Sequence, residues 1–150
     1  MVEVVKSNGQ LHACLDPRDV NKAVLRERYP LPTIEDVATR LHGTKMFRML
    51  DAKNGFWHII LDEESSELTT FHTSFGRYCW RRLLFGLCSA PEVFLRWMHE
   101  VNAGLTGVKV IADDFLVVGY GLDREAAIVD HDRNLVQFLM RCQENNLAVY

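Results

Sequence analysis

The chain places two adjacent carboxylates, Asp113 and Asp114, inside the apolar run V108-K-V-I-A-D-D-F-L-V-V118. β-Branched residues on both sides of the pair predict two strands joined by a tight turn. Neighbouring carboxylates repel one another and resist burial unless a cation lies between them. A surface hairpin tip is the simpler alternative, but favoured turns place Gly after Asp, whereas Phe115 follows here. The pair is therefore a candidate site for a divalent metal ion.

Composition narrows the class of protein and of metal site. A length of 150 residues, 48% hydrophobic and 25% charged, indicates one soluble globular domain or part of one. There is no signal-peptide pattern and no apolar run of about 20 residues, which argues against secretion and membrane association. The four cysteines form no C-x-x-C pair and the six histidines show no zinc spacing. We therefore expect reduced thiols, a cytoplasmic or nuclear location, and oxygen ligands for any metal.

The distribution of charge does not by itself indicate a nucleic-acid-binding protein. The net charge of −3 is not typical of a nucleic-acid-binding domain, which is usually basic. Two basic clusters run against this balance, one at Lys22, Arg26 and Arg28 and the other at Arg77, Arg81 and Arg82. Such clusters are more often solvated faces than phosphate-binding tracks.

The spacing of apolar residues, caps and turn residues predicts an α+β fold, with helices packed on an antiparallel sheet. Asn8-Gly9 predicts a hairpin near the start, and the prolines of 29–32 require extended chain. Helices are expected from the Thr33 cap to Gly43, from Ser89 to near Gly104, and over 123–145, where Leu135, Leu139 and Cys142 share a face. Strands are expected over 46–50, 57–61, 68–75 and 77–83, in the hairpin at Asp113-Asp114, and beginning at 147–150.

A third carboxylate ends a predicted strand. If 46–50 pairs with one arm of the hairpin, Asp51 comes beside Asp113 and three acids surround one position. Magnesium prefers such carboxylate oxygens together with substrate phosphates. Two such ions about 3.5–4 Å apart would activate an attacking hydroxyl and stabilise the leaving oxygen of a phosphoryl transfer.

Five blocks in series then resemble the reverse transcriptases of gypsy-class LTR retrotransposons, over nearly the whole chain and in the family's order. They are L31-P-T-I-E-D-V, L50-D-A-K-N-G-F-W, T69-T-F-H-T-S-F-G-R-Y, F85-G-L-C-S-A-P-E-V-F and I111-A-D-D. The resemblance implies a right-hand polymerase fold, of which residues 1–150 supply part of the fingers and most of the palm. It also implies that the acid pair is the Tyr-x-Asp-Asp hairpin of the palm.

The resemblance assigns roles by position. Asp51, Asp113 and Asp114 are the expected catalytic acids, and they hold metal together with the backbone carbonyl of Ala52. The nucleotide-binding positions are Lys6, His12, Asn54, Gly55, Phe56 and Phe85, and the template-binding positions are Arg18 and Asn21. Phe56 matches the steric gate that excludes a 2′-hydroxyl, although a core aromatic residue is an equal alternative from the sequence alone.

The chain departs from the family pattern at four positions. His12 stands where Arg is usual, and an imidazole stacks but lacks the guanidinium fork. Ile111 replaces the commonest Tyr before the acids, and Leu84 and Leu95 replace Pro and Gln.

The implied function is that of an RNA-directed DNA polymerase, a nucleotidyltransferase that uses two magnesium ions, with manganese as an alternative. Its partners would be an RNA or DNA template with primer, deoxynucleoside triphosphates and the remaining Pol polyprotein segments, in a cytoplasmic virus-like particle or the nucleus. Primer grip, thumb, connection and RNase H would lie beyond residue 150, so we expect the isolated fragment to be inactive. The alternative is a non-catalytic remnant or domesticated fragment that binds nucleic acid or protein.

Overall fold

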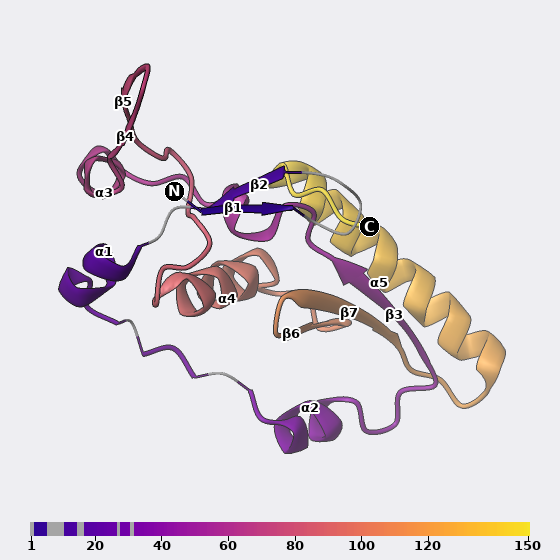
Figure 1. Cartoon of the computed structure of the whole chain (residues 1–150). Helices are drawn as coiled ribbons and strands as arrows, with labels where there is room; N and C mark the ends of the chain where they lie inside the picture. Colours follow the sequence, from indigo (N-terminus) through magenta and orange to yellow (C-terminus); the bar gives the residue numbers. More distant parts are fainter. Residues whose placement is uncertain (1, 6–10, 15–16, 27, 31) are drawn as a thin grey trace. The chain divides into compact units, whose positions relative to one another are not determined.

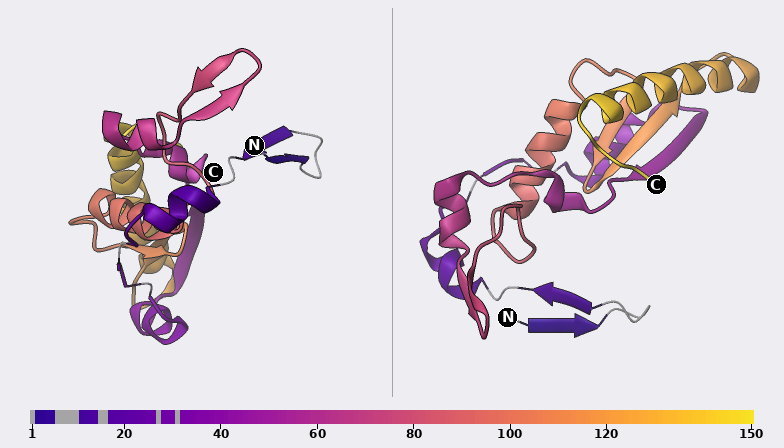
Figure 2. Two further views of the ribbon diagram at one scale, coloured as in Figure 1. Left: turned by 60° about the vertical axis from the view of Figure 1, so that its left-hand side comes forward. Right: turned by 90° about the horizontal axis from the view of Figure 1, so that it is seen from above.

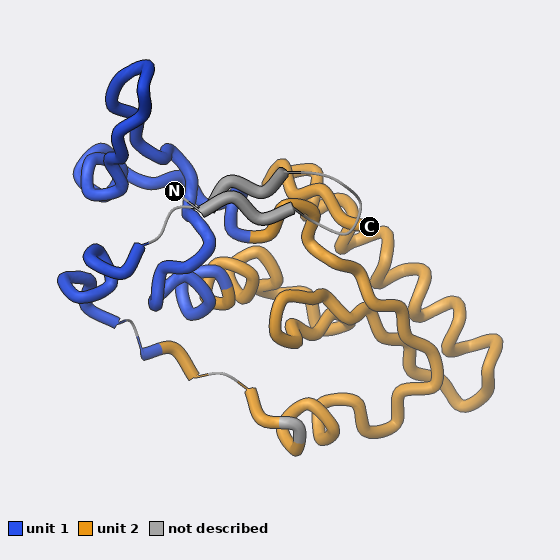
Figure 3. Tube along the Cα trace, viewed as in Figure 1, with its two compact units in different colours: residues 1–28, 56–94 blue, residues 29–55, 95–150 orange. Residues whose placement is uncertain are grey.

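The computed structural model describes residues 2–5, 11–14, 17–26, 28–30 and 32–150, and of 2–5, 11–14 and Ile34 only the backbone. The chain divides into two compact units, one formed by residues 1–28 and 56–94 and the other by 29–55 and 95–150 (Figure 3). Helix α4 (Ala90–Val101) begins in the first unit and ends in the second.

The first unit begins with a hairpin. Strands β1 (Val2–Val5) and β2 (Leu11–Cys14) pair antiparallel, with Val5 opposite Leu11. This pairing confirms the predicted hairpin, while its predicted Asn8-Gly9 turn lies outside the described residues. Helix α1 (Arg18–Ala23) follows and was not predicted, because the segment contains no repeating apolar face.

In the rest of this unit one predicted strand was wrong, and two others are shorter than predicted. Residues predicted as the strand 57–61 instead form the end of a 3₁₀ helix, η1 (Gly55–His58), followed by a single bridge between Ile60 and Arg82. The strands predicted over 68–75 and 77–83 do pair, antiparallel, but only over β4 (Phe71–Thr73) and β5 (Gly76–Tyr78). Helix α3 (Glu63–Leu68) precedes them, and its Asp62 cap accepts a hydrogen bond from the Ser65 amide.

The second unit is built on a three-stranded antiparallel sheet in the order β3-β7-β6. Its strands are β3 (Met46–Asp51), β6 (Val108–Ile111) and β7 (Asp114–Gly119). The central strand β7 pairs with β3 from Met46 opposite Gly119 to Asp51 opposite Asp114. On its other side, β7 pairs with β6 through a turn that follows Ile111. Strand β3 and the hairpin were both predicted.

Helix α5 (Arg124–Glu144) lies along one face of this sheet (Figures 1 and 2). Phe138 of α5 packs on Phe115 of β7 with ring centroids 4.8 Å apart, and both side chains are fully buried. The predicted helix is confirmed, but its predicted face was partly wrong. Leu139 is 45% exposed, and the buried stripe consists of Ala127, His131, Asn134, Phe138 and Cys142.

Glycine permits the close approach of β7 to α5. A Cβ atom on Gly119 would lie 2.2 Å from the carbonyl oxygen of Ala127. No side chain fits at that distance, so the packing of α5 over the sheet depends on the missing side chain.

Of two further predictions in the second unit, the capped helix is confirmed and the strand at 147–150 is not. Thr33 caps helix α2 (Ile34–Arg40), because its hydroxyl accepts from the Asp36 amide while the Asp36 carboxylate accepts from the Thr33 amide. Over 147–150, where a strand was expected to begin, the structure has a single antiparallel bridge between Val149 and Ala52, just past the end of β3, and no strand. Among the described helices, none combines the length and apolar character that crossing a membrane requires.

Candidate polymerase active site

The three predicted acids lie at one end of the β3-β7-β6 sheet. Asp51 ends β3, Asp114 begins β7, and the two are cross-strand partners. The turn between β6 and β7 consists of Ala112 and Asp113, so Asp113 lies at the tip. Two expectations are corrected here: the turn is not Asp113-Asp114, and the residue opposite Asp51 is Asp114 rather than Asp113.

The backbone of this turn is strained. Ala112 has a φ of 51°, in the left-handed region that L-residues other than Gly, Asn and Asp rarely occupy. The cost of a left-handed L-residue is about 1–2 kcal/mol. Strain of this kind is concentrated at functional sites, where the surrounding structure maintains it.

The electrostatics of the three acids agree with their proximity. Partial burial raises the pKa of Asp114, and the negative charges of Asp51 and Asp113 raise it further. A cation placed among the carboxylates would reverse this effect, because opposite charge favours the ionised form. The described residues nevertheless contain no three His, Cys, Asp or Glu side chains already arranged to hold a metal ion.

The segment after Asp51 turns sharply. Asn54 and Gly55 have positive φ values of 65° and 39°, and the Gly55 amide donates to the Ala52 carbonyl at 3.0 Å. That carbonyl is the one expected to complete a metal ligand sphere, and it keeps a second lone pair for such a role. The Gly55 amide, expected to hold a triphosphate, is engaged in the turn.

Two predicted nucleotide-binding residues of the first unit pack together. The rings of Phe56 and Phe85 have centroids 4.9 Å apart, and Phe56 meets the buried Phe94 edge-on at 5.2 Å. Phe85 remains 39% exposed. Such aromatic packing stabilises the Phe56 ring, and it fits an ordinary core residue as well as the predicted steric gate.

Asn21, predicted to bind template, makes two hydrogen bonds within the first unit. Its Nδ2 donates to the Gly86 carbonyl at 2.9 Å, and its Oδ1 accepts from the Cys88 amide at 2.9 Å. The side chain therefore fixes the loop that carries Phe85, a structural role that the sequence did not reveal because the partners lie more than sixty residues away. Arg18 begins α1 with an exposed side chain.

The side chains of the two other predicted nucleotide-binding residues, Lys6 and His12, are not described by this structure. Lys6 lies outside the described residues, and for His12 only its backbone pairing with Val4 is described.

Comparison with known proteins identifies the family. The sequence profile described as "Reverse transcriptase (RNA-dependent DNA polymerase)" matches residues 4–150. The chain belongs to the reverse transcriptase family.

Relatives of this reverse transcriptase domain are much longer proteins. It is 36% identical over 138 residues to the retrovirus-related Pol polyprotein from transposon 412 of Drosophila melanogaster, covering 91% of this chain and 11% of that protein. It is 32% identical over 148 residues to the enzymatic polyprotein of cauliflower mosaic virus, covering 98% of this chain and 21% of that protein. The domain thus spans between a tenth and about a fifth of the length of these relatives.

Solved structures support the fold of this reverse transcriptase domain. A foamy viral protease–reverse transcriptase in complex with double-stranded DNA matches with a TM-score of 0.82 at 24% identity, over 98% of this chain and 25% of that one. The same viral protein in complex with an RNA/DNA hybrid matches with a TM-score of 0.70 at 23% identity, over 93% of this chain and 18% of that one. The α+β fold predicted for part of a polymerase is confirmed.

Proposed function

We propose that this chain forms part of the fingers and most of the palm of an RNA-directed DNA polymerase from a gypsy-class LTR retrotransposon. The reaction is transfer of a nucleotide from a deoxynucleoside triphosphate to a primer 3′-hydroxyl on an RNA or DNA template. The observation that carries the proposal is the grouping of Asp51, Asp113 and Asp114 at one sheet end in a member of the reverse transcriptase family. Thumb, connection and RNase H belong to other segments of a Pol polyprotein, working in a cytoplasmic virus-like particle or in the nucleus.

The residues at this sheet end suit divalent cations. They are hard oxygen donors, and like-charge repulsion raises the pKa of Asp114 when no cation is among them. Asp51 and Asp113 would hold two magnesium or manganese ions, with Asp114 adjacent and the Ala52 carbonyl as a further ligand. Such ions supply activation of the attacking hydroxyl and charge neutralisation at the leaving pyrophosphate.

The other residues orient the nucleotide and template. Phe56, held by Phe85 and Phe94, takes the place beneath the sugar where a 2′-hydroxyl would collide. Lys6, His12, Asn54 and Gly55 serve the nucleotide, with backbone amides near Asn54 suited to its phosphates. Arg18 and Asn21 serve the template strand, and the hydrogen bonds of Asn21 to the loop around Phe85 link the two functions.

The experiment uses the chain joined to its remaining polymerase segments, with an RNA template, annealed DNA primer, nucleotides and magnesium. Asp113→Asn should lower primer extension by at least a hundredfold, because loss of one electrostatic contact to a transition state already costs about that much. Asp19→Asn is the matched control, since Asp19 is exposed and forms an ion pair with Lys22, which is exposed as well. Undiminished extension by Asp113→Asn would refute the proposal.

A second arm tests the sugar gate. Phe56→Val should admit ribonucleotides, because the smaller side chain leaves room for the 2′-hydroxyl. If selectivity for deoxynucleotides is unchanged, Phe56 is an ordinary core aromatic residue. Residues 1–150 alone should extend no primer, because chemistry also needs the primer end held about 3–3.5 Å from the reacting phosphorus.

A further inference from the structure

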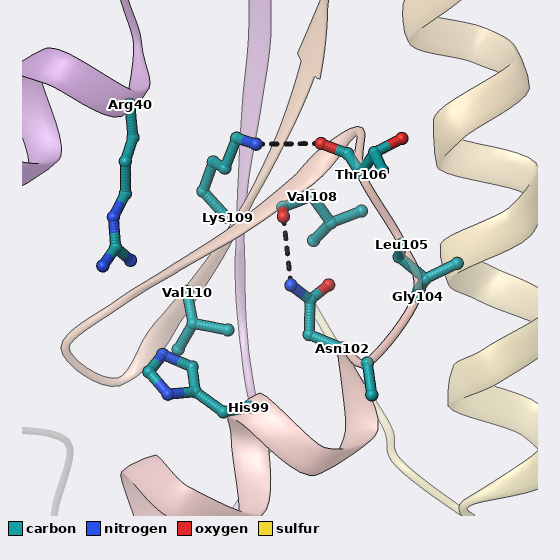
Figure 4. A pocket seen from close by; sticks show the side chains of 10 residues that line it. Arg40, His99, Asn102, Gly104, Leu105, Thr106, Val108, Lys109 and Val110 are labelled. Atoms are coloured by element: carbon teal, nitrogen blue, oxygen red, sulfur yellow. Dashed lines mark hydrogen bonds between the residues drawn. The ribbon is translucent and has the colours of Figure 1, made fainter.

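A pocket of about 480 Å³ lies in the second unit, away from the sequence positions assigned to catalysis. Figure 4 shows that three elements surround it: Arg40 comes from α2, His99 from α4, and Lys109 and Val110 from β6, while Asn102 directly follows α4. The loop 104–106 completes the lining. This volume is typical of sites for small molecules and larger than a single bound ion requires.

The positive charge of the residues that line the pocket favours binding of an anion. Arg40 and Lys109 bring two positive charges, and none of the described lining residues is acidic. Among the described residues, the Arg40 guanidinium makes no hydrogen bond or close ion pair, although the pKa of the Asp36 carboxyl is lowered by its hydrogen bonds to Thr33 and further by the charge of Arg40. Lys109 donates one hydrogen bond to the Thr106 carbonyl at 2.9 Å, which leaves two of its three donor positions for a ligand.

His99 adds a neutral donor. Burial lowers the pKa of His99, and the positive charge of Arg40 lowers it further, so the ring is uncharged at neutral pH. The hydroxyl of Tyr29 lies 2.6 Å from Nδ1 of His99. A phenol is a better hydrogen-bond donor than a neutral imidazole, so we assign the hydroxyl as donor and the ring proton to Nε2. Figure 4 shows the guanidinium of Arg40 directed toward this ring.

Asn102 adds an acceptor that lacks a partner. Its Nδ2 donates to the Val108 carbonyl at 3.0 Å, but its Oδ1 is buried without a hydrogen bond among the described residues. An unpaired buried acceptor costs about 1–3 kcal/mol, a cost that a ligand hydroxyl would remove. The neighbouring side chains of Leu105, Val108 and Val110 are apolar and suit the carbon atoms of such a ligand.

We propose that this pocket binds a small phosphomonoester that carries hydroxyl groups, such as a sugar phosphate, at a site separate from the nucleotide and metal positions. The phosphate oxygens accept hydrogen bonds from Arg40, Lys109 and Nε2 of His99, and a hydroxyl donates to Oδ1 of Asn102. A doubly charged phosphomonoester matches the two cations of the lining.

Isothermal titration calorimetry with ribose 5-phosphate tests the proposal, using the 150-residue chain in EDTA so that no metal site contributes. We expect millimolar or tighter binding at neutral pH, weaker binding of inorganic phosphate, and no binding of ribose. Amide resonances of Gly104, Leu105 and Thr106 should shift in a ¹⁵N correlation spectrum. If ribose 5-phosphate does not bind at millimolar concentrations, the proposal is wrong, and binding no tighter than that of phosphate overturns the hydroxyl contact to Asn102.

Variants locate the site. Arg40→Gln and Lys109→Gln should each weaken binding about tenfold or more, because each removes a charge-assisted hydrogen bond. Lys109→Arg retains the charge and should retain binding. Arg124→Gln makes the same chemical change on an exposed arginine of α5 and should leave the affinity unchanged. Circular dichroism verifies that each variant is folded, and unaltered affinity in a folded Arg40→Gln chain would contradict the assignment.

Discussion

Asp51 lies directly opposite Asp114 in the antiparallel pairing of β3 with β7. The Cβ atoms of such partners are about 4.5–5.5 Å apart, and like charges in this position destabilise a sheet. Asp113, in the adjoining turn, adds a third negative charge. The sheet end therefore opposes folding when no cation is present, which several measurements can detect.

The first prediction concerns Asp114→Asn in EDTA. The pKa of Asp114 is raised by folding, so ionised Asp114 opposes folding at pH values above its folded-state pKa. That opposition disappears below the unfolded pKa of about 3.9, where the carboxyl is protonated in both states. Urea unfolding should show Asp114→Asn to be more stable than the parent chain at neutral pH, with the difference shrinking toward zero in acid.

Asp19→Asn is the control for this comparison, because Asp19 is almost fully exposed and lies on a different element. It should change the free energy of unfolding by less than about 0.5 kcal/mol. A variant Asp114→Asn that is less stable than the parent at neutral pH would mean that the carboxylate makes a favourable contact in the folded chain.

The second prediction concerns magnesium. A ligand that binds only the folded state adds RT ln(1 + [L]/Kd), which is about 1.4 kcal/mol at ten times the Kd. Thermal unfolding should therefore shift upward on addition of magnesium chloride. Asp51→Asn should abolish the shift, whereas sodium chloride at equal ionic strength should produce none. A shift that persists in Asp51→Asn would show that the ion binds elsewhere.

The third prediction concerns the Asn21 side chain. Asn21→Ala removes two hydrogen bonds and leaves the Gly86 carbonyl and the Cys88 amide without this partner. We expect a loss of about 1–3 kcal/mol in the free energy of unfolding. Lys22→Ala, on the same helix, removes only an exposed ion pair and should cost less than about 1 kcal/mol. Equal losses of unfolding free energy in the two variants would contradict the structural role assigned to Asn21.

The fourth prediction concerns the contact between β7 and α5. Gly119→Ala forces a Cβ atom against the Ala127 carbonyl, and overpacking of a core typically costs about 1–3 kcal/mol. Gly43→Ala is the comparison, because a Cβ atom there meets nothing within 4 Å and only its φ of 77° is unfavourable. Chemical denaturation should rank Gly119→Ala as the more damaging change, and the reverse order would show that α5 shifts to accommodate the methyl group.

Elements with strong local signals were predictable from the sequence. The Thr33 cap located α2, and the apolar runs on both sides of Asp113 located β6 and β7. The failed strand at 57–61 shows the limit of alternation, because Gly55 at positive φ turns the chain into a 3₁₀ helix before any partner strand is reached. Helix α3 did have a signal, since Asp62 followed by Glu63 and Glu64 is a typical helix start.

The location of the acids at neighbouring strand ends was predictable, but their register was not. Strand ends identified Asp51 and the acid pair, yet no local pattern specifies whether Asp113 or Asp114 stands opposite Asp51. The pocket of Arg40, His99 and Lys109 had no sequence signal, because its side chains come from three different elements and Arg40 lies far from the other two along the chain. Such convergence depends on tertiary packing alone.

The buried residues of β7 keep the acid in its position in the sheet. Asp114 is followed by Phe115, which is fully buried against Phe138. A slip of one residue in the pairing with β3 would move Phe115 to the opposite face of the sheet, away from Phe138, and would turn the Asp114 carboxylate toward α5. Because β7 is buried on both faces, the slip would disturb the packing on each face and would desolvate the carboxylate further. Core packing thus stabilises the strand register that brings the carboxylates together. The geometry of the site therefore depends on the packing of the residues beneath it.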